Sequence, residues 1–144
     1  MAETAFQTIN IAAPMQRVYA IASDFESYPE WAKDVKEATI RARDDQGRPV
    51  EVDFRASALG RSTHYTLAYD YTAAPTVLGW KMMRGDIMRS IDGAYTFEES
   101  STGGVEVRYD LAIELVVPLP GFVKRRAEQR ILNTVRDLKA RSES

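Results

Sequence analysis

The end of the chain joins two periodicities that together restrict the fold. Residues 105–115 alternate apolar and polar side chains, which is typical of a strand with one buried face. A Pro-Leu-Pro-Gly break follows at 118–121, and from Phe122 to about Arg141 apolar side chains recur at helical spacing. The apolar stripe of this predicted helix consists of Val123, Ala127, Ile131, Val135 and Leu138. About 20 helical residues span ~30 Å, enough to cross a broad sheet.

Most of the chain before this point also alternates with period two. Strands are predicted at about 4–11, 36–43, 50–58, 65–72, 78–82, 91–97 and 105–115. Between the first two, apolar residues follow Pro14 at helical spacing, and a second short helix begins at Ser27 with Pro29 in its first turn. Clean alternation and short connections favour an antiparallel meander. The predicted fold is α+β, with a curved seven-stranded sheet wrapped around a long C-terminal helix and two short helices after the first strand.

Length and composition predict one ordinary globular domain over residues 1–144. The chain has no cysteine, which excludes disulfides, thiol nucleophiles and cysteine metal sites, and is compatible with the reducing cytoplasm. No apolar run approaches the ~20 residues of a membrane span. The N-terminal residues show no signal peptide. We therefore expect a cytoplasmic protein.

Charge is unevenly distributed along the chain. The net charge of −2 argues against broad nucleic-acid binding. However, the stretch from Lys124 to Arg141 holds seven basic and two acidic residues, a net charge of +5. The predicted C-terminal helix is therefore a basic strip on an acidic body. Such a helix is either the solvated face of a core helix or a contact for an anionic membrane, an acidic partner or ribosomal RNA.

One face of the predicted sheet is rich in aromatic side chains, and the facing helix offers mainly small and aliphatic ones. Buried tyrosine hydroxyls need hydrogen-bond partners, which a wet or ligand-filled hollow supplies more readily than a dry core. Apolar walls with a few placed polar groups are typical of ligand pockets. The alternative is that the aromatic side chains simply pack. The predicted ligand-binding residues are Phe54, Tyr65, Leu67, Tyr69, Trp80, Met82, Arg89, Tyr95, Tyr109 and Phe122.

Arg89 is the candidate catalytic residue. It is in phase with Ile87 and Ile91, so an unbroken strand would point it inward, where a guanidinium can pair with a carboxylate, a phosphate or an enolate. The alternative is that a bulge turns it outward, or that it pairs with Asp24 or Glu30.

Four segments together resemble one family. Residues 13–20 (APMQRVYA) resemble the opening of START-like helix-grip proteins, and residues 25–31 (FESYPEW) are similar to their second-helix segment. Residues 92–97 (DGAYTF) resemble their G-x-W-x-F/L strand, with tyrosine in place of tryptophan, and residues 118–122 resemble the lead-in to their last helix. The chain thus resembles the START-like (SRPBCC) superfamily, in its polyketide cyclase/dehydrase-type branch. This resemblance implies the helix-grip fold, but it spans lipid carriers, receptors and cyclases, so it leaves the activity open.

The sequence lacks the residues that a metal site, a catalytic triad or a cofactor-binding motif requires. The single histidine, His64, lies out of phase with the inward side chains, and there is no cysteine, so neither a metal site nor a Ser-His-Asp triad is expected. The glycines form no phosphate-binding or dinucleotide-binding motif, and no cofactor is expected.

Three functions remain. The first is the binding and transport of a hydrophobic small molecule such as a lipid, quinone or polyketide. The second is a cofactor-independent polyketide aromatase/cyclase or dehydratase, in which Arg89 with Tyr65, Tyr69 or Tyr95 stabilises an enolate. The third is a partner- or membrane-binding module that acts through the basic helix. The sequence does not indicate the oligomeric state.

Overall fold

The computed structural model describes residues 3–58, 61–116 and 133–144. The elements follow the predicted order. They are β1 (Glu3–Ile11), α1 (Met15–Ala22), the 3-10 turn η1 (Phe25–Ser27), α2 (Tyr28–Trp31), β2 (Val35–Arg43), β3 (Pro49–Ala58), β4 (Arg61–Asp70), β5 (Val77–Gly85), β6 (Met88–Glu99) and β7 (Val105–Leu115). A C-terminal helix follows, with its described residues at 133–143.

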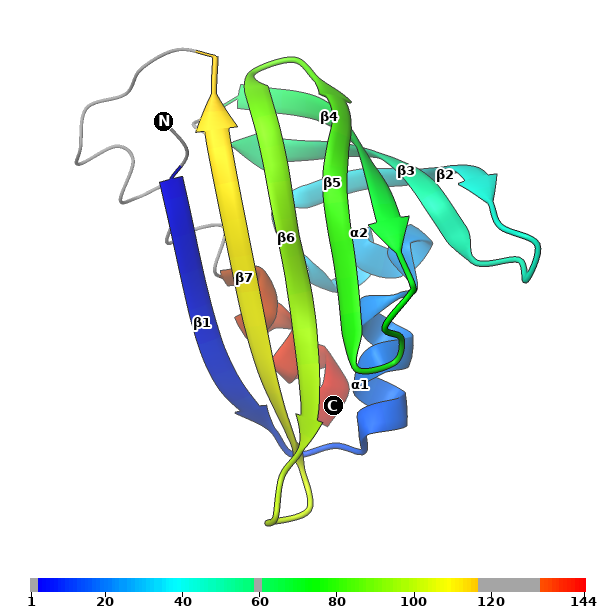
Figure 1. The fold of residues 1–144 in the computed structure, drawn as a ribbon. Helices are drawn as coiled ribbons and strands as arrows, with labels where there is room; N and C mark the ends of the chain where they lie inside the picture. Colours follow the sequence, from blue (N-terminus) through cyan, green and yellow to red (C-terminus); the bar gives the residue numbers. More distant parts are fainter. Residues whose placement is uncertain (1–2, 59–60, 117–132) are drawn as a thin grey trace.

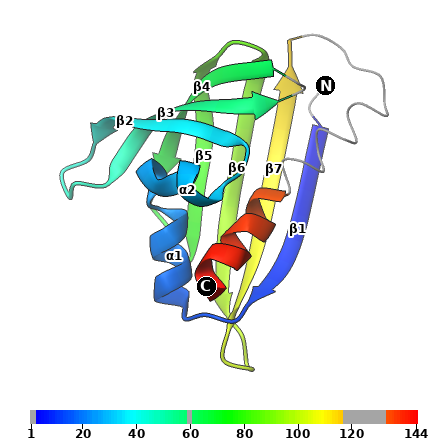
Figure 2. The ribbon, with the colours of Figure 1, turned by 180° about the vertical axis from the view of Figure 1, so that it is seen from behind.

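The seven strands form one antiparallel sheet in the order β1-β7-β6-β5-β4-β3-β2. Strands β2 to β7 are a meander, and β1 adds to the β7 edge, with Phe6 opposite Asp110. The sheet is strongly curved, and the helices lie together on its concave side (Figures 1 and 2). The predicted α+β helix-grip architecture, with two short helices after the first strand, is confirmed.

Both short helices start close to the predicted residues. Pro14 is extended and directly precedes α1. Pro29 lies in the first turn of α2, where its missing N–H breaks no helical hydrogen bond. Ser27, a possible cap in the sequence, occupies the N-cap position of α2, but its side chain makes no capping hydrogen bond.

The C-terminal helix packs into the concave side through the apolar stripe predicted for it. Its described stripe residues, Val135 and Leu138, are fully buried. Phe122, Val123, Ala127 and Ile131 lie outside the described residues, as does the break at 118–121.

Polar contacts hold the end of this helix. Arg17 Nε donates to the carbonyl of Ser142 at 2.8 Å, and Lys139 Nζ donates to the carbonyl of Asn10 at 2.8 Å. Arg141 pairs with Glu30 of α2 at 3.0 Å. Of the seven basic residues in the predicted strip, Lys139 and Arg141 thus stabilise the fold. Lys124, Arg125, Arg126 and Arg130 lie outside the described residues.

Candidate functional site

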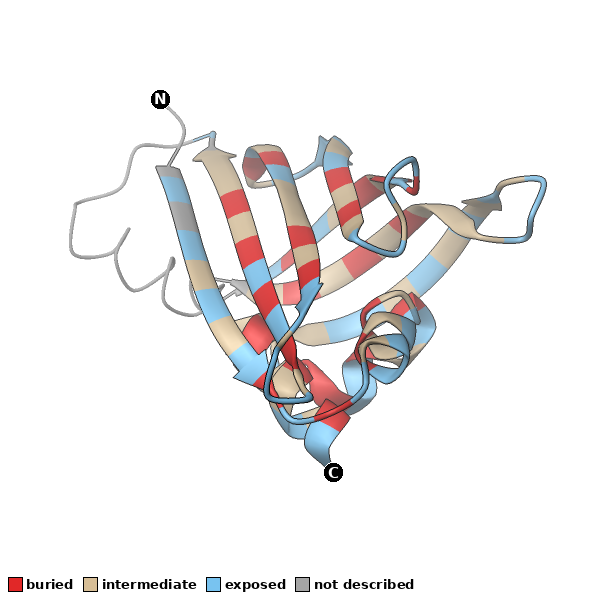
Figure 3. Cartoon of the chain, turned by 60° about the horizontal axis from the view of Figure 1, so that its bottom comes forward, coloured by how far each residue is buried: buried red, intermediate tan, exposed pale blue. Residues whose placement is uncertain are grey.

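The candidate site is a set of aromatic side chains on the inner surface of the sheet. We call it the concave aromatic face: Phe54 of β3, Tyr65 and Tyr69 of β4, Trp80 of β5, Tyr95 of β6 and Tyr109 of β7. All are buried except Tyr65, which is partly buried. Alternation along each strand aims them to the same side, and bands of buried residues alternate with less buried ones along the strands (Figure 3).

Ring contacts join these residues across neighbouring strands. The Trp80 ring lies 5.2 Å from Tyr95, 5.7 Å from Tyr109 and 6.1 Å from Tyr69, between ring centroids. Phe54 stacks on Tyr65 at 5.6 Å. Neighbouring strands therefore present a continuous aromatic wall, as the residue pattern predicted.

The short helices add aromatic groups that sequence reasoning did not include in the site. Phe25 stacks on Tyr69 with 4.0 Å between centroids, and Tyr28 lies 6.0 Å from Phe54. Trp31 packs on Tyr28 at 4.7 Å. The helical spacing of Phe25 and the Tyr28-to-Trp31 segment were visible in the sequence, but only the curvature of the sheet brings this helical pair against β3 and β4.

Some of the buried hydroxyls are satisfied within the protein. The Tyr28 hydroxyl donates to the carbonyl of Ala22. Burial raises the pKa of Tyr95, and the nearby Tyr28 hydroxyl, to which Tyr95 donates a hydrogen bond, raises it further. A short relay thus runs from Tyr95 through Tyr28 to a backbone carbonyl.

Other hydroxyls have no such partner. Within the described part of the chain, the hydroxyls of Tyr65, Tyr69 and Tyr109 make no hydrogen bond to the protein. Burial raises the pKa of Tyr65 to about 12, and the Asp34 carboxylate raises it further. Burial also raises the pKa of Tyr69 and Tyr109, and the neighbouring phenols add to both shifts. At neutral pH all three phenols are protonated, so they are available as hydrogen-bond donors.

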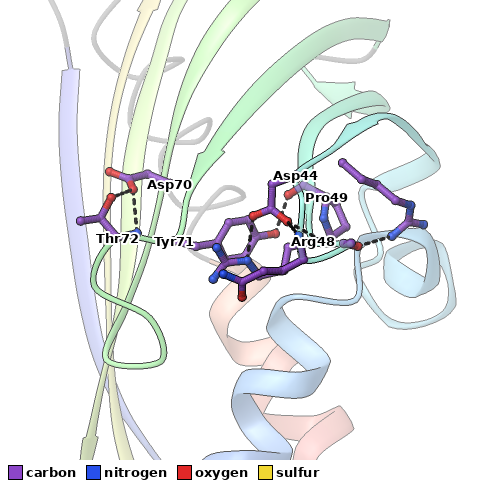
Figure 4. A network of polar contacts seen from close by, with 9 residues as sticks. Asp44, Arg48, Pro49, Asp70, Tyr71 and Thr72 are labelled. Atoms are coloured by element: carbon purple, nitrogen blue, oxygen red, sulfur yellow. Dashed lines mark hydrogen bonds and ion pairs between the residues drawn. The ribbon is translucent and has the colours of Figure 1, made fainter.

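Tyr71 shows the opposite situation, at the end of β4. Its hydroxyl donates to the carbonyl of Pro49 at 2.5 Å, and the Arg48 guanidinium lies 4.7 Å above its ring (Figure 4). Arg48 is held by Asp44 at 2.8 Å, in the turn where Gly47 has a φ of +81°. Tyr71 therefore fastens the β2–β3 hairpin and has no hydroxyl to offer a ligand.

The two remaining apolar candidates of the described sheet lie on the same inner surface. Leu67 is buried, and Met82 is partly buried against the core. The Met82 sulfur lies close to the backbone of Gly85, where an added Cβ would approach it to 2.8 Å. Both residues therefore fit the predicted apolar wall, while Phe122 lies outside the described residues.

Arg89 lies on the outer surface of the sheet, so its predicted inward orientation is wrong. Its side chain is 61% exposed, and its guanidinium pairs with Glu114 of β7 at 3.3 Å. The cause is an irregularity in the β6–β7 register between Met88 and Ser90, which shifts the alternation before Ile91. This is the bulge that the sequence left open as an alternative. Arg89 contributes no charge to the concave aromatic face.

Metal-binding and histidine chemistry find little support in the geometry. His64 is exposed, as expected from its phase, and its Nδ1 lies 3.8 Å from Asp86. Among the described residues, no three acidic or histidine side chains gather as a metal-ligand set. The buried polar side chains of the described part are Thr63, Thr66 and Ser142, so none of its buried residues is charged.

Fold and site together define a helix-grip protein with an aromatic inner surface, and sequence comparison agrees. The family described as polyketide cyclase / dehydrase and lipid transport matches residues 4–143. The chain belongs to this family, within the START-like (SRPBCC) superfamily, and has its hydrophobic-ligand-binding fold. No curated protein sequence matches the chain.

Solved structures show the same fold. A START superfamily protein from Mycobacterium smegmatis has 25% identity and a TM-score of 0.89, with 97% of each chain covered. A protein from Thermus thermophilus has 20% identity and a TM-score of 0.83, again with 97% of each chain covered. The Zhui aromatase/cyclase from Streptomyces has 12% identity and a TM-score of 0.71, over 97% of this chain and 88% of the other. None of the described helices is long and apolar enough to cross a bilayer.

Proposed function

We propose that this protein binds, and carries through the cytoplasm, a hydrophobic small molecule held against the concave aromatic face. The observation that carries the proposal is the convergence of buried aromatic side chains from neighbouring strands, three of whose hydroxyls have no partner among the described residues. Membership of a family that includes lipid transport supports it. The ligand would contact Phe54, Tyr65, Leu67, Tyr69, Trp80, Met82, Tyr95 and Tyr109.

Binding is favoured over catalysis by the chemistry of the inner surface. A cyclase or dehydratase needs groups that exchange protons near neutral pH. The phenols of Tyr69 and Tyr109 do not exchange protons near neutral pH, because burial holds their pKa well above the usual value. Arg89, the group proposed to stabilise an enolate, lies on the outer surface beside Glu114. The family's cyclase members keep the enzyme function as the second candidate.

Carriage between membranes is part of the proposal. A carrier must collect and release its ligand at a bilayer, and a cationic helix face favours an anionic surface. Transfer of a fluorescent lipid between vesicles measures this step. We expect faster transfer from vesicles with anionic lipid than from neutral ones, and equal rates would remove the membrane contact from the proposal.

The binding proposal is tested on protein purified under mild conditions. Native mass spectrometry should detect a bound compound, and solvent extraction followed by chromatography should identify a hydrophobic molecule. A matched pair of variants then tests where the compound binds. Leu67→Trp adds bulk on the concave side, and Ala68→Trp adds the same bulk on the outer side of the next position.

We expect cargo occupancy to fall in Leu67→Trp and to stay unchanged in Ala68→Trp, with circular dichroism confirming that both variants fold. Protein that carries no cargo, and that binds no member of a panel of lipids, quinones and aromatic polyketides, would refute the proposal.

A further inference from the structure

We propose that the concave aromatic face selects neutral ligands that carry a hydrogen-bond acceptor, such as a ketone or quinone carbonyl, and rejects ligands whose buried end is a carboxylate or a phosphate. This inference rests on the proposed function and adds to it the chemical class of the ligand. It assigns the selection to the hydroxyls of Tyr65, Tyr69 and Tyr109.

The concave aromatic face has an excess of hydrogen-bond donors. The hydroxyls of Tyr65, Tyr69 and Tyr109 find no acceptor among the described residues, although their side chains lie on the buried side of the sheet. They come from β4 and β7, and Tyr65 and Tyr109 lie near enough to Tyr69 to raise the pKa of its phenol. A carbonyl oxygen accepts two hydrogen bonds, so one carbonyl placed here would satisfy two of the three donors.

The described residues of the buried interior supply no counter-charge for an anion. None of the buried residues in the described part is charged, and the one guanidinium that was predicted inward, that of Arg89, faces solvent. Besides burial, the group that acts on Tyr65 is the Asp34 carboxylate, and those that act on Tyr69 and Tyr109 are phenols. An anion moved from water into such surroundings loses its hydration without gaining a cation.

Two other tyrosines of the core differ from these three in having acceptors within the protein. Tyr71 and Tyr28 belong to the same core, yet their hydroxyls donate to the carbonyls of Pro49 and Ala22. The protein therefore supplies acceptors to the tyrosines that fasten its elements and leaves the hydroxyls of Tyr65, Tyr69 and Tyr109 without them among the described residues. This separates phenols with a structural role from phenols available to a ligand, and it makes Tyr71 a matched control.

The test uses three naphthalene probes of similar size, substituted at the same ring position: acetylnaphthalene (a neutral ketone), ethylnaphthalene (no acceptor) and naphthoate (an anion at neutral pH). Dissociation constants are measured by equilibrium dialysis with the delipidated full chain, and with Tyr69→Phe, Tyr109→Phe and Tyr71→Phe. Thermal melts confirm that each variant folds.

We expect the ketone to bind at least about tenfold more tightly than naphthoate, because the phenols can donate to either ligand but the anion gains no cation from the described residues in exchange for its hydration. Tyr69→Phe or Tyr109→Phe should weaken ketone binding about two- to twelvefold, the range of one hydrogen bond, and should not weaken ethylnaphthalene binding. Tyr71→Phe should leave the ketone-to-ethyl ratio unchanged.

Naphthoate binding as tightly as the ketone, or a ketone-to-ethyl ratio that is the same in Tyr69→Phe, Tyr109→Phe and the unmodified protein, would overturn the inference while the proposed function stands. Failure of all three probes to bind, in a protein that also yields no cargo, would overturn both.

Discussion

The two faces of the sheet carry the same strands but opposite chemistry. On the outer face, charges are paired across strands, as in Arg55 with Glu37 at 2.8 Å and Arg89 with Glu114 at 3.3 Å. On the concave face the buried residues of the described strands are mainly aromatic and aliphatic. These outer-face charges are thus paired within the protein, whereas on the concave face the hydroxyls of Tyr65, Tyr69 and Tyr109 have no partner among the described residues.

This difference indicates where the molecule tolerates change. Exposed ion pairs contribute little to stability because water already solvates both charges. Buried aromatic side chains contribute much more, since their truncation removes apolar contacts and leaves a cavity. We therefore expect substitutions on the outer face to be mild, and substitutions on the concave face to affect both stability and ligand binding.

The largest contrast should come from removing one aromatic ring on each face. Trp80→Ala should lower the free energy of unfolding by about 3–5 kcal/mol, because Trp80 is buried among three tyrosine rings. Phe6→Ala should cost about 1 kcal/mol or less, since Phe6 is 61% exposed and mainly supports Arg108, 4.4 Å above its ring. Urea denaturation measures both. A loss well below 3 kcal/mol for Trp80→Ala would mean that its surroundings are already loosely packed.

A second contrast uses two glycines on neighbouring strands. A Cβ on Gly93 would lie 2.6 Å from the Trp80 ring and 2.6 Å from the carbonyl of Asp110, whereas a Cβ on Gly79 would meet nothing closer than 3.7 Å. We expect Gly93→Ala to destabilise the protein by about 1–3 kcal/mol through overpacking, and Gly79→Ala to be neutral or slightly stabilising. Thermal melts compare the two, and similar melting temperatures would contradict the close approach of Trp80 to β6.

The buried phenols predict a loss of stability at alkaline pH. Burial raises the pKa of Tyr69 in the folded protein, so above pH ~10 the unfolded chain releases a proton that the folded chain retains. Stability therefore falls as pH rises past that value, by on the order of 1 kcal/mol per pH unit for each such phenol. Tyr69→Phe should make the decline shallower in urea titrations at several pH values.

Tyr19→Phe is the matched control for this slope. Burial raises the pKa of Tyr19 too, but Arg48 lowers it, and its side chain is only partly buried. Removal of the Tyr19 hydroxyl should change the decline of stability with pH less than Tyr69→Phe does. An identical alkaline profile for the unmodified protein and Tyr69→Phe would mean that this phenol is not protected from solvent.

The smallest effect should be that of Arg89→Ala on the outer face. Loss of the exposed pair with Glu114 should change stability by only about 0.2–1 kcal/mol, and ligand affinity should not change at all. Denaturation and equilibrium dialysis test the two parts. A large loss of binding would place Arg89 in the site after all.

Much of this contrast could be predicted from the sequence, because alternation determines which face a strand residue occupies. Phe54, Tyr69, Trp80 and Tyr109 were all predicted to point inward, and all are buried. The failure at Arg89 has a local cause. A bulge adds a residue to one strand and reverses the alternation, and neither Met88 nor Ser90 signals it.

The rest of the candidate site depends on contacts between distant parts of the chain. Stacking of Phe25 on Tyr69 requires the curvature of the whole sheet, which no local pattern encodes. The hydrogen-bond partners of individual tyrosine hydroxyls could not be predicted from the sequence either. Tyr69 and Tyr71 are two residues apart in the same alternating run, yet one hydroxyl is left without a partner among the described residues and the other donates to Pro49.

The fluorescence of Trp80, which is part of the concave aromatic face, reports whether the ligand lies against that face. The chain has two tryptophans, so Trp31→Phe leaves Trp80 as the only one. We predict that titration with acetylnaphthalene changes the Trp80 emission saturably, with the same dissociation constant as equilibrium dialysis gives. Unchanged emission while dialysis reports bound ligand would show that the ligand binds elsewhere.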